Sequence, residues 1–235
     1  MCRRVFYSSC FSVFGKDCPN RDAPAPDDTI QLPLSALGIS SSCNESLGEL
    51  YRKKRGVKFR ALRYPAILAP YNYPTFRLAD YAKEMFVSAT KAKAFSCWLE
   101  QDVSLPFMLA SDAIEATVKF IETDYAALPR RVYNLGGVSI SPAGFAREIR
   151  RWAPEFKVTY GSDFRGQRMQ TMPASLDANL AATDWGWKLN TTAKDMCERM
   201  TNEFQKLRKE NAEDMKFREM RVRQKQKFHA SRSSN

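Results

Sequence analysis

Residues 35–63, SALGISSSCNESLGELYRKKRGVKFRALR, decide the fold class of this chain. Residues 35–52 predict a helix that ends at the basic run before Gly56, and residues 57–63 predict a strand. Residues 5–14, VFYSSCFSVF, predict an earlier buried strand, because β-branched, aromatic and small residues fill it. A helix that connects two such strands indicates that the strands pair in parallel. The chain is therefore expected to be an α/β protein.

The same alternation continues along the chain. Further helices are predicted at residues 79–91, 113–123 and 142–152, with short strands at residues 94–99 and 157–160. Asp112 is expected to cap the second of these helices, and Ser141 the third, which has Pro142 in its first turn. Gly136 and Gly137 are expected to form a turn before that third helix.

Short motifs also follow one another in a fixed order. They are Ser9-Cys10 with Phe14-Gly15, Tyr64-Pro65, Ser104–Met108, Asp112–Thr117, Tyr133–Leu135 and Asp184–Lys188. This ordered set resembles the extended short-chain dehydrogenase/reductases, most closely their L-threonine 3-dehydrogenase branch. The resemblance implies the C-terminal portion of a Rossmann-like doubly wound sheet plus a small α/β lobe, over residues 1–188. It also implies that the first strands of the sheet are missing, through truncation, a separate polypeptide or a misplaced start codon.

The resemblance places degenerate residues at the catalytic positions of the family. Leu37 stands where the family has its catalytic Tyr, and Ser41 stands where it has the Lys one helical turn on. Cys10 stands where a Ser or Thr polarises the substrate oxygen, and a thiol is the weaker hydrogen-bond donor. No catalytic residue is therefore predicted.

The sequence also lacks the glycine-rich turn that would hold the pyrophosphate of NAD. No Gly-x-x-Gly-x-x-Gly occurs, and the chain has only ten glycines. The segment that touches the nicotinamide in the family survives as Tyr64, Pro65, Ala66 and Ile67, which are vestigial cofactor-binding candidates. We expect no cofactor, with NAD as the alternative.

Composition limits the setting of the protein. The 235 residues carry a net charge of +11, which points to an acidic partner such as nucleic acid or an anionic surface. The six cysteines form no CxxC pair and there is one histidine, so no metal site is predicted. Scattered thiols favour a reducing compartment, and no apolar run approaches the length of a membrane span.

Residues 189–235 differ from the rest and are expected to form a basic helical extension. Residues 194–228 contain no proline or glycine and predict a long helix. The C-terminal half of this helix and the residues after it supply the side chains predicted to bind RNA or an acidic partner: Lys216, Arg218, Arg221, Arg223, Lys225, Lys227 and Arg232. A solvated helix that frays into a tail is the alternative interpretation.

Two functions follow from these observations. The first is a catalytically inactive, dehydrogenase-like structural subunit of a large assembly, namely a mitochondrial ribosome or another ribonucleoprotein. In that assembly, protein subunits cover the open sheet edge and RNA binds the basic helix. The alternative is an L-threonine 3-dehydrogenase or a related NAD-dependent epimerase/dehydratase, represented by an N-terminally incomplete chain. A mitochondrial location is expected from the resemblance.

Overall fold

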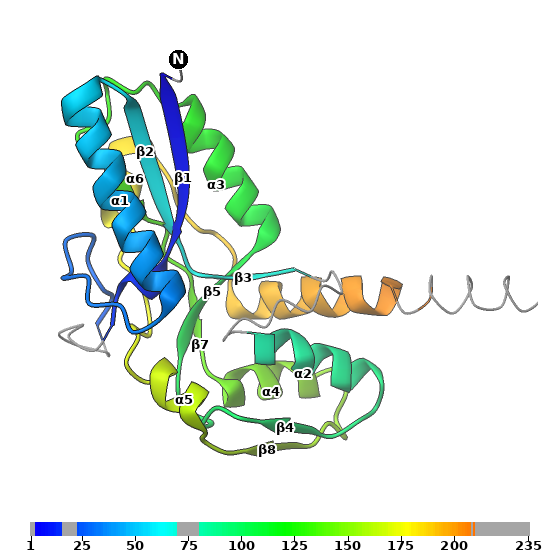
Figure 1. Ribbon diagram of the computed structural model, residues 1–235. Helices are drawn as coiled ribbons and strands as arrows, with labels where there is room; N and C mark the ends of the chain where they lie inside the picture. The colour runs from blue at the N-terminus through cyan, green and yellow to red at the C-terminus, as the bar shows by residue number, and fades with distance from the viewer. Residues whose placement is uncertain (1–2, 16–22, 70–79, 208, 210–235) are drawn as a thin grey trace, which may run out of the picture.

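A parallel sheet forms the upper half of the molecule (Figure 1). The computed structural model describes residues 3–15, 23–69, 80–207 and 209. Three strands, β1 (Arg4–Cys10), β2 (Lys58–Tyr64) and β6 (Val132–Asn134), lie in the order β1-β2-β6, and both pairings are parallel. The predicted α/β class and parallel crossover are confirmed. The first strand ends earlier than predicted, because a 3₁₀ turn, η1 (Phe11–Val13), follows Cys10 directly.

Helix α1 (Ala36–Arg55) is the crossover between β1 and β2. The Ser35 hydroxyl accepts a hydrogen bond from the Gly38 N–H at its start, and Gly56, with φ at 65°, ends it in the left-handed conformation. The face that α1 buries carries Gly38, Ser41 and Glu45, all small or polar. Short side chains there allow the helix to lie close to the sheet.

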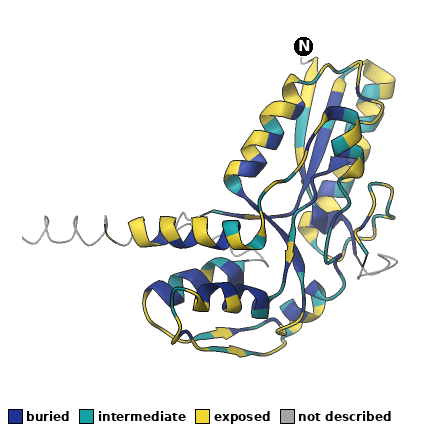
Figure 2. Cartoon of the chain, turned by 180° about the vertical axis from the view of Figure 1, so that it is seen from behind, coloured by how far each residue is buried: buried dark blue, intermediate teal, exposed yellow. Residues whose placement is uncertain are grey.

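The large apolar residues of α1 therefore point away from the sheet. Leu37, Leu47, Leu50 and Tyr51 are 43% to 56% exposed. Figure 2 shows the chain from the side opposite to that of Figure 1, with buried residues in dark blue and exposed residues in yellow. An apolar stripe on the outside of a helix marks a surface that is suited to contact with another element.

Helix α3 (Ala110–Glu122) packs on the opposite face of the sheet (Figure 1). Phe6 of β1 contacts Phe120 of α3 edge to face, with ring centroids 6.4 Å apart. The predicted cap at Asp112 is wrong, because the helix begins three residues earlier than predicted, at Ala110, with Leu109 at the N-cap position. Asp112 instead lies inside the first turn, where its carboxylate accepts a hydrogen bond from the Thr191 hydroxyl.

A second small sheet connects the main sheet to the lobe below it. Its strands β3 (Ala66–Leu68), β5 (Leu105–Leu109) and β7 (Val138–Ile140) lie in that order, and β5 pairs with β7 antiparallel. Strand β7, which the sequence analysis did not predict, stands between Gly136–Gly137 and the next helix.

The lobe consists of two helices over a short ladder. Helices α2 (Asp80–Thr90) and α4 (Pro142–Arg150) cover the strands β4 (Phe95–Cys97) and β8 (Val158–Tyr160), which pair in parallel. Ser141 caps α4, as predicted. Two short helices complete the described elements, α5 (Phe164–Met169) and α6 (Asn179–Trp185).

A helix over residues 193–207 lies against this lobe (Figure 1). Its Met196, Met200 and Phe204 are buried, and the ring of Phe204 stacks on Phe86 of α2 with centroids 6.2 Å apart. The domain boundary proposed at residue 188 stays a prediction. The basic residues predicted to bind RNA, from Lys216 to Arg232, lie outside the described residues.

Candidate functional site at the carboxyl end of the first strand

The fold brings together two of the three residues that the resemblance places at catalytic positions. Cys10 ends β1, and Ser41 lies on the buried face of α1 directly above it. The Cys10 Sγ and Ser41 Oγ atoms are 3.6 Å apart, and either atom can donate the hydrogen bond. Leu37, one turn earlier on α1, is 56% exposed and takes no part in this contact.

Tyr7 joins the same cluster from the middle of β1. Its hydroxyl donates to Ser41 Oγ at 3.3 Å and accepts from the Asn44 side-chain amide at 3.3 Å. Hydroxyl, thiol and amide groups thus form a continuous chain from the exposed Asn44 to Cys10. Each hydroxyl or thiol group in such a chain can both donate and accept a hydrogen bond, so a mobile proton can be held at any of these groups.

Sequence reasoning did not select Tyr7, because it lies on a strand and not on the helix that carries the catalytic positions. The signal that would have found it is the two-residue period of β1. Val5, Tyr7 and Ser9 lie on one face of the strand. The hydrogen bonds of Tyr7 to Ser41 and of Ser9 to Glu45 show that this face points to α1.

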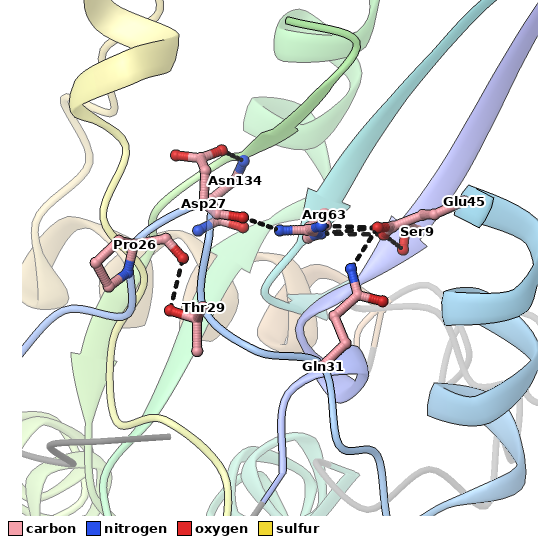
Figure 3. A network of polar contacts seen from close by, with 8 residues as sticks. All are labelled: Ser9, Pro26, Asp27, Thr29, Gln31, Glu45, Arg63 and Asn134. Atoms are coloured by element: carbon pink, nitrogen blue, oxygen red, sulfur yellow. Dashed lines mark hydrogen bonds and ion pairs between the residues drawn. The ribbon is translucent and has the colours of Figure 1, made fainter. Parts of the chain in front are cut away.

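A buried polar network supports this cluster from below (Figure 3). The Glu45 carboxylate accepts hydrogen bonds from the Ser9 hydroxyl at 2.5 Å, from the Gln31 amide at 2.7 Å and from the Arg63 guanidinium at 2.7 Å. Arg63 and Glu45 are almost fully buried. Burying a carboxylate is costly unless several donors surround it, and here three side chains do so.

The network continues to the end of β6 through the loop before α1. Arg63 donates to the Asp27 carbonyl oxygen, and the Asp27 carboxylate accepts from the Asn134 backbone N–H at 2.7 Å (Figure 3). Burial raises the pKa of Asp27, while the hydrogen bond from Asn134 and the charge of Arg63 oppose that rise. The carboxyl ends of β1, β2 and β6 are thereby fixed to one another.

The segment that the resemblance assigns to the cofactor, Tyr64–Ile67, lies at the end of β2 and in β3. Tyr64 is buried, burial raises its pKa, and its hydroxyl shares a hydrogen bond with Thr117 of α3. Pro65 and Ala66 lead into β3, where Ile67 is exposed. The Tyr64 hydroxyl therefore forms part of the contact between β2 and α3.

Two expected absences concern metals and membranes. Among the described residues, no group of three His, Cys, Asp or Glu side chains is placed to hold a metal ion. In the same part of the chain, the structure contains no helix with the length and apolar character needed to cross a bilayer.

The comparison with protein families shows which family the chain belongs to. Residues 1–136 match the model of the NAD dependent epimerase/dehydratase family. The chain belongs to this family. The mitochondrial L-threonine 3-dehydrogenase of Sus scrofa is 35% identical over 200 residues, which cover 85% of this chain and 53% of the relative. The Bos taurus protein of the same name is 34% identical over a stretch of equal length. The chain thus spans about half the length of these relatives.

Solved structures agree with this relationship. The apo form of the GalE-like L-threonine dehydrogenase from Cupriavidus necator superposes with a TM-score of 0.81 at 34% identity, over 85% of this chain and 72% of that one. Its holo form gives a TM-score of 0.79 over 84% of this chain and 64% of that one. The predicted Rossmann-like fold and the predicted resemblance are confirmed.

The expectation that the protein uses no cofactor is wrong. The chain belongs to a family defined as NAD dependent, and a 34% identical relative has been solved in a holo form. The 235 residues lack a glycine-rich turn, but that turn binds only the pyrophosphate end of a dinucleotide, so its absence does not exclude binding of the nicotinamide end.

The described residues fit the other end of such a cofactor. In open α/β sheets ligands bind beyond the carboxyl ends of the parallel strands. Here that edge presents Cys10, Pro65 and the Gly136–Gly137 turn, with Ser41 above Cys10. These residues would hold the nicotinamide end of NAD, which supplies hydride acceptance when bound. Residues that cradle the phosphates are not found among those described.

Proposed function

We propose that this chain forms the substrate-side part of an NAD-dependent oxidoreductase of the L-threonine 3-dehydrogenase type. The observation that carries the proposal is the match to the C. necator enzyme, which extends over 85% of the chain and thus over both the sheet and the lobe. A likeness confined to the sheet would support only a shared nucleotide-binding architecture. The substrate class is a small hydroxy amino acid, and a mitochondrial location agrees with the names of the mammalian relatives.

The residues of the site suggest how the chain would contribute. Oxidation of a secondary alcohol removes a hydride from carbon and a proton from the hydroxyl. The Cys10 and Ser41 side chains, hydrogen bonded to each other, would orient that hydroxyl. Tyr7, which donates to Ser41, would extend the route for the proton toward the surface at Asn44.

Leu37 favours a second candidate function, which is ligand binding without turnover. Its side chain is exposed, has no ionisable group and stands at the position of the family's catalytic Tyr. A protein of this kind would keep the fold and the ligand site and lack the proton acceptor. The hypothesis of a ribosomal structural subunit finds no support among the relatives, which are named as dehydrogenases and epimerase/dehydratases.

Two measurements on the purified full-length chain separate these functions. NADH formation in the presence of L-threonine tests for turnover, and calorimetry with NAD and with L-threonine tests for binding. Threonine-dependent NADH formation that Cys10→Ala abolishes supports the oxidoreductase. Binding without NADH formation supports the second candidate. The absence of both would contradict the proposal.

A further inference from the structure

Strand β6 is an outer strand of the parallel sheet, because β2 is the one described strand that pairs with it. The Leu135 N–H donates to the carbonyl oxygen of Arg63 on β2, so residues of odd number turn their backbone groups toward that strand. The backbone groups of Val132 and Asn134 therefore point to the free edge. The Asn134 N–H already donates to the Asp27 carboxylate there, and the Val132 N–H points the same way.

A polar hollow lies beside this free edge, with a volume of about 380 Å³. Its walls come from the C-terminal half of α1, the end of β2, the loop before α1 and the start of β6. Besides Pro129 and Val132, its lining consists of four arginines and two carboxylates: Arg52, Arg63, Arg130, Arg131, Asp27 and Glu49. Sites for small molecules are mostly apolar, so a lining of this kind indicates a charged ligand.

Positive charge is in excess in the polar hollow. Arg52 and Arg63 each pair with a glutamate of α1, at 2.6 Å and 2.7 Å. Arg130 and Arg131 pair with no carboxylate in the part of the chain that the structure describes. Uncompensated charge in a recess attracts an ion of opposite sign, because the low-dielectric walls concentrate its field. The polar hollow is thus suited to an anion.

The two unpaired guanidinium groups differ in how firmly they are held. Arg131 lies with Cζ 4.2 Å from the centroid of the Tyr125 ring and donates to the carbonyl oxygens of Leu128 and Arg130. Arg130 uses only backbone atoms in its hydrogen bonds with described residues. Burial raises the pKa of Asp27, and the charge of Arg130 acts against that rise, so the Arg130 side chain lies near Asp27. Arg130 is therefore the cation that is available to a ligand.

Asp27 adds a hydrogen-bond acceptor beside these cations (Figure 3). Its Oδ1 atom accepts the Asn134 N–H at 2.7 Å, and no donor from the described residues reaches its Oδ2 atom. A carboxylate oxygen accepts hydrogen bonds and repels a phosphate group. A ligand that places a hydroxyl group at Asp27 and a phosphate at Arg130 would match both side chains.

We propose that the polar hollow binds a small phosphorylated molecule that also carries hydroxyl groups, such as a sugar phosphate. Arg130 and the Val132 N–H donate to the phosphate, and the fixed charge of Arg131 adds to the attraction. Asp27 accepts a hydrogen bond from a hydroxyl of the ligand. The volume suits a molecule of this size, whereas a nucleic acid strand requires several successive phosphate contacts.

This site is separate from the candidate site at Cys10. Strand β2 stands between β1, which ends at Cys10, and β6, whose free edge borders the polar hollow. The inference therefore does not rest on the proposed oxidoreductase function, and either can fail without the other.

Calorimetry on the purified full-length chain tests the proposal, with ribose 5-phosphate as the probe. Arg130→Gln should weaken its binding by at least about tenfold, because a charged donor to the phosphate is lost. Inorganic phosphate should bind the wild type more weakly than ribose 5-phosphate. Asp27→Asn should narrow that difference, because a neutral amide is the weaker acceptor and does not repel phosphate. Hydrogen exchange at Val132 should slow when ribose 5-phosphate is bound.

Arg147→Gln is the matched control. Arg147 carries the same charge on α4 of the lobe, its side chain is 75% exposed, and it does not line the polar hollow. Circular dichroism shows whether each variant folds. Equal losses in Arg130→Gln and Arg147→Gln, or no binding of ribose 5-phosphate, would overturn the proposal. Inorganic phosphate that binds as tightly as ribose 5-phosphate would also overturn it, as would an RNA oligonucleotide that binds more tightly through Arg130.

Discussion

Glu45 of α1 and Arg63 of β2 form a buried ion pair, with 2.7 Å between Oε2 and Nη2 and side chains that are 6% and 7% exposed. Ser9 of β1 and Gln31 of the preceding loop donate to the same carboxylate. The pair therefore joins the first two strands, the crossover helix and the loop. Ser41 lies one turn before Glu45, so the geometry of the candidate site depends on this pair.

Replacement of Glu45 should be strongly destabilising. Glu45→Ala leaves the Arg63 guanidinium buried without its counter-ion, and the expected loss is about 3–5 kcal/mol in the free energy of unfolding. Urea denaturation of the purified chain measures this loss. Glu49→Ala is the control, because Glu49 pairs with Arg52 at the surface, where the expected loss is at most about 1 kcal/mol. Equal losses in the two variants would contradict the structural role given to the buried pair.

Gly48 should not tolerate a methyl group. A Cβ atom built there would lie 2.2 Å from the Phe59 ring, which is buried. The overlap is expected to cost about 1–3 kcal/mol, which exceeds the roughly 1 kcal/mol that alanine gains over glycine inside a helix. Thermal or urea unfolding should thus show a net loss for Gly48→Ala. Phe59→Leu should cost less in the Gly48→Ala background than alone, and additive losses would refute the predicted clash.

Restoring the family residues should raise turnover. The triple variant Cys10→Thr, Leu37→Tyr and Ser41→Lys returns a polarising hydroxyl and a proton acceptor with its neighbouring cation. General acid–base groups contribute roughly 10²–10⁴ in rate, and NADH formation with L-threonine should increase by that order. Leu50→Tyr is the control, since Leu50 is equally exposed on α1 and lies far along the helix from Ser41. An unchanged rate in a triple variant that binds NAD would exclude Leu37 as the limiting residue.

The reactivity of each cysteine toward a labelling reagent should depend on how deeply its thiol is buried. Cys43 is exposed on α1, whereas Cys97 and Cys197 are buried, and burial raises the pKa of both buried thiols. A maleimide reagent at neutral pH should therefore modify Cys43 in the native chain and reach the other two only after denaturation. Peptide mass spectrometry identifies the labelled positions. Rapid native labelling of Cys197 would show that the helix over residues 193–207 does not stay packed on the lobe.

The sequence predicted most elements because their local signals are strong. Ser35 and Gly56 mark the two ends of α1, and Ser141 with Pro142 marks the start of α4. Asp112 carried an equally good capping signal, but the strand β5 continues directly into α3, and the carboxylate binds Thr191 instead. Capping preference is a local property, whereas this contact joins residues far apart in the sequence.

The candidate site was predicted in part. The resemblance assigned both Cys10 and Ser41 to catalytic positions, and the structure brings the two side chains together. The role of Tyr7 could not be found from helical spacing, because its contact with Ser41 is made between a strand and a helix. The outward direction of Leu47 was missed for a similar reason: periodicity identifies an apolar stripe and does not say which element covers it.

Alkaline pH should destabilise the protein through Cys197. Burial raises the pKa of this thiol from its usual value of 9 to about 12, with the nearby Glu148 adding to the rise. Below pH 9 the thiol keeps its proton in both the native and the unfolded states, so its contribution to stability is constant. Between pH 9 and 12 the unfolded chain loses the proton while the native chain keeps it, and stability falls as pH rises.

The difference between the wild-type chain and Cys197→Ala isolates this contribution, because other groups titrate alike in both proteins. At neutral pH the variant should be less stable, since the buried sulfur is lost from the packed interface of the lobe. From pH 9 upward the gap in unfolding free energy should narrow, because only the wild type loses stability through this thiol. Cys43→Ala should show no such change, as its thiol is exposed. Urea denaturation at a series of pH values provides the data, and a gap that stays constant up to pH 12 would mean that the native thiol ionises as readily as the unfolded one.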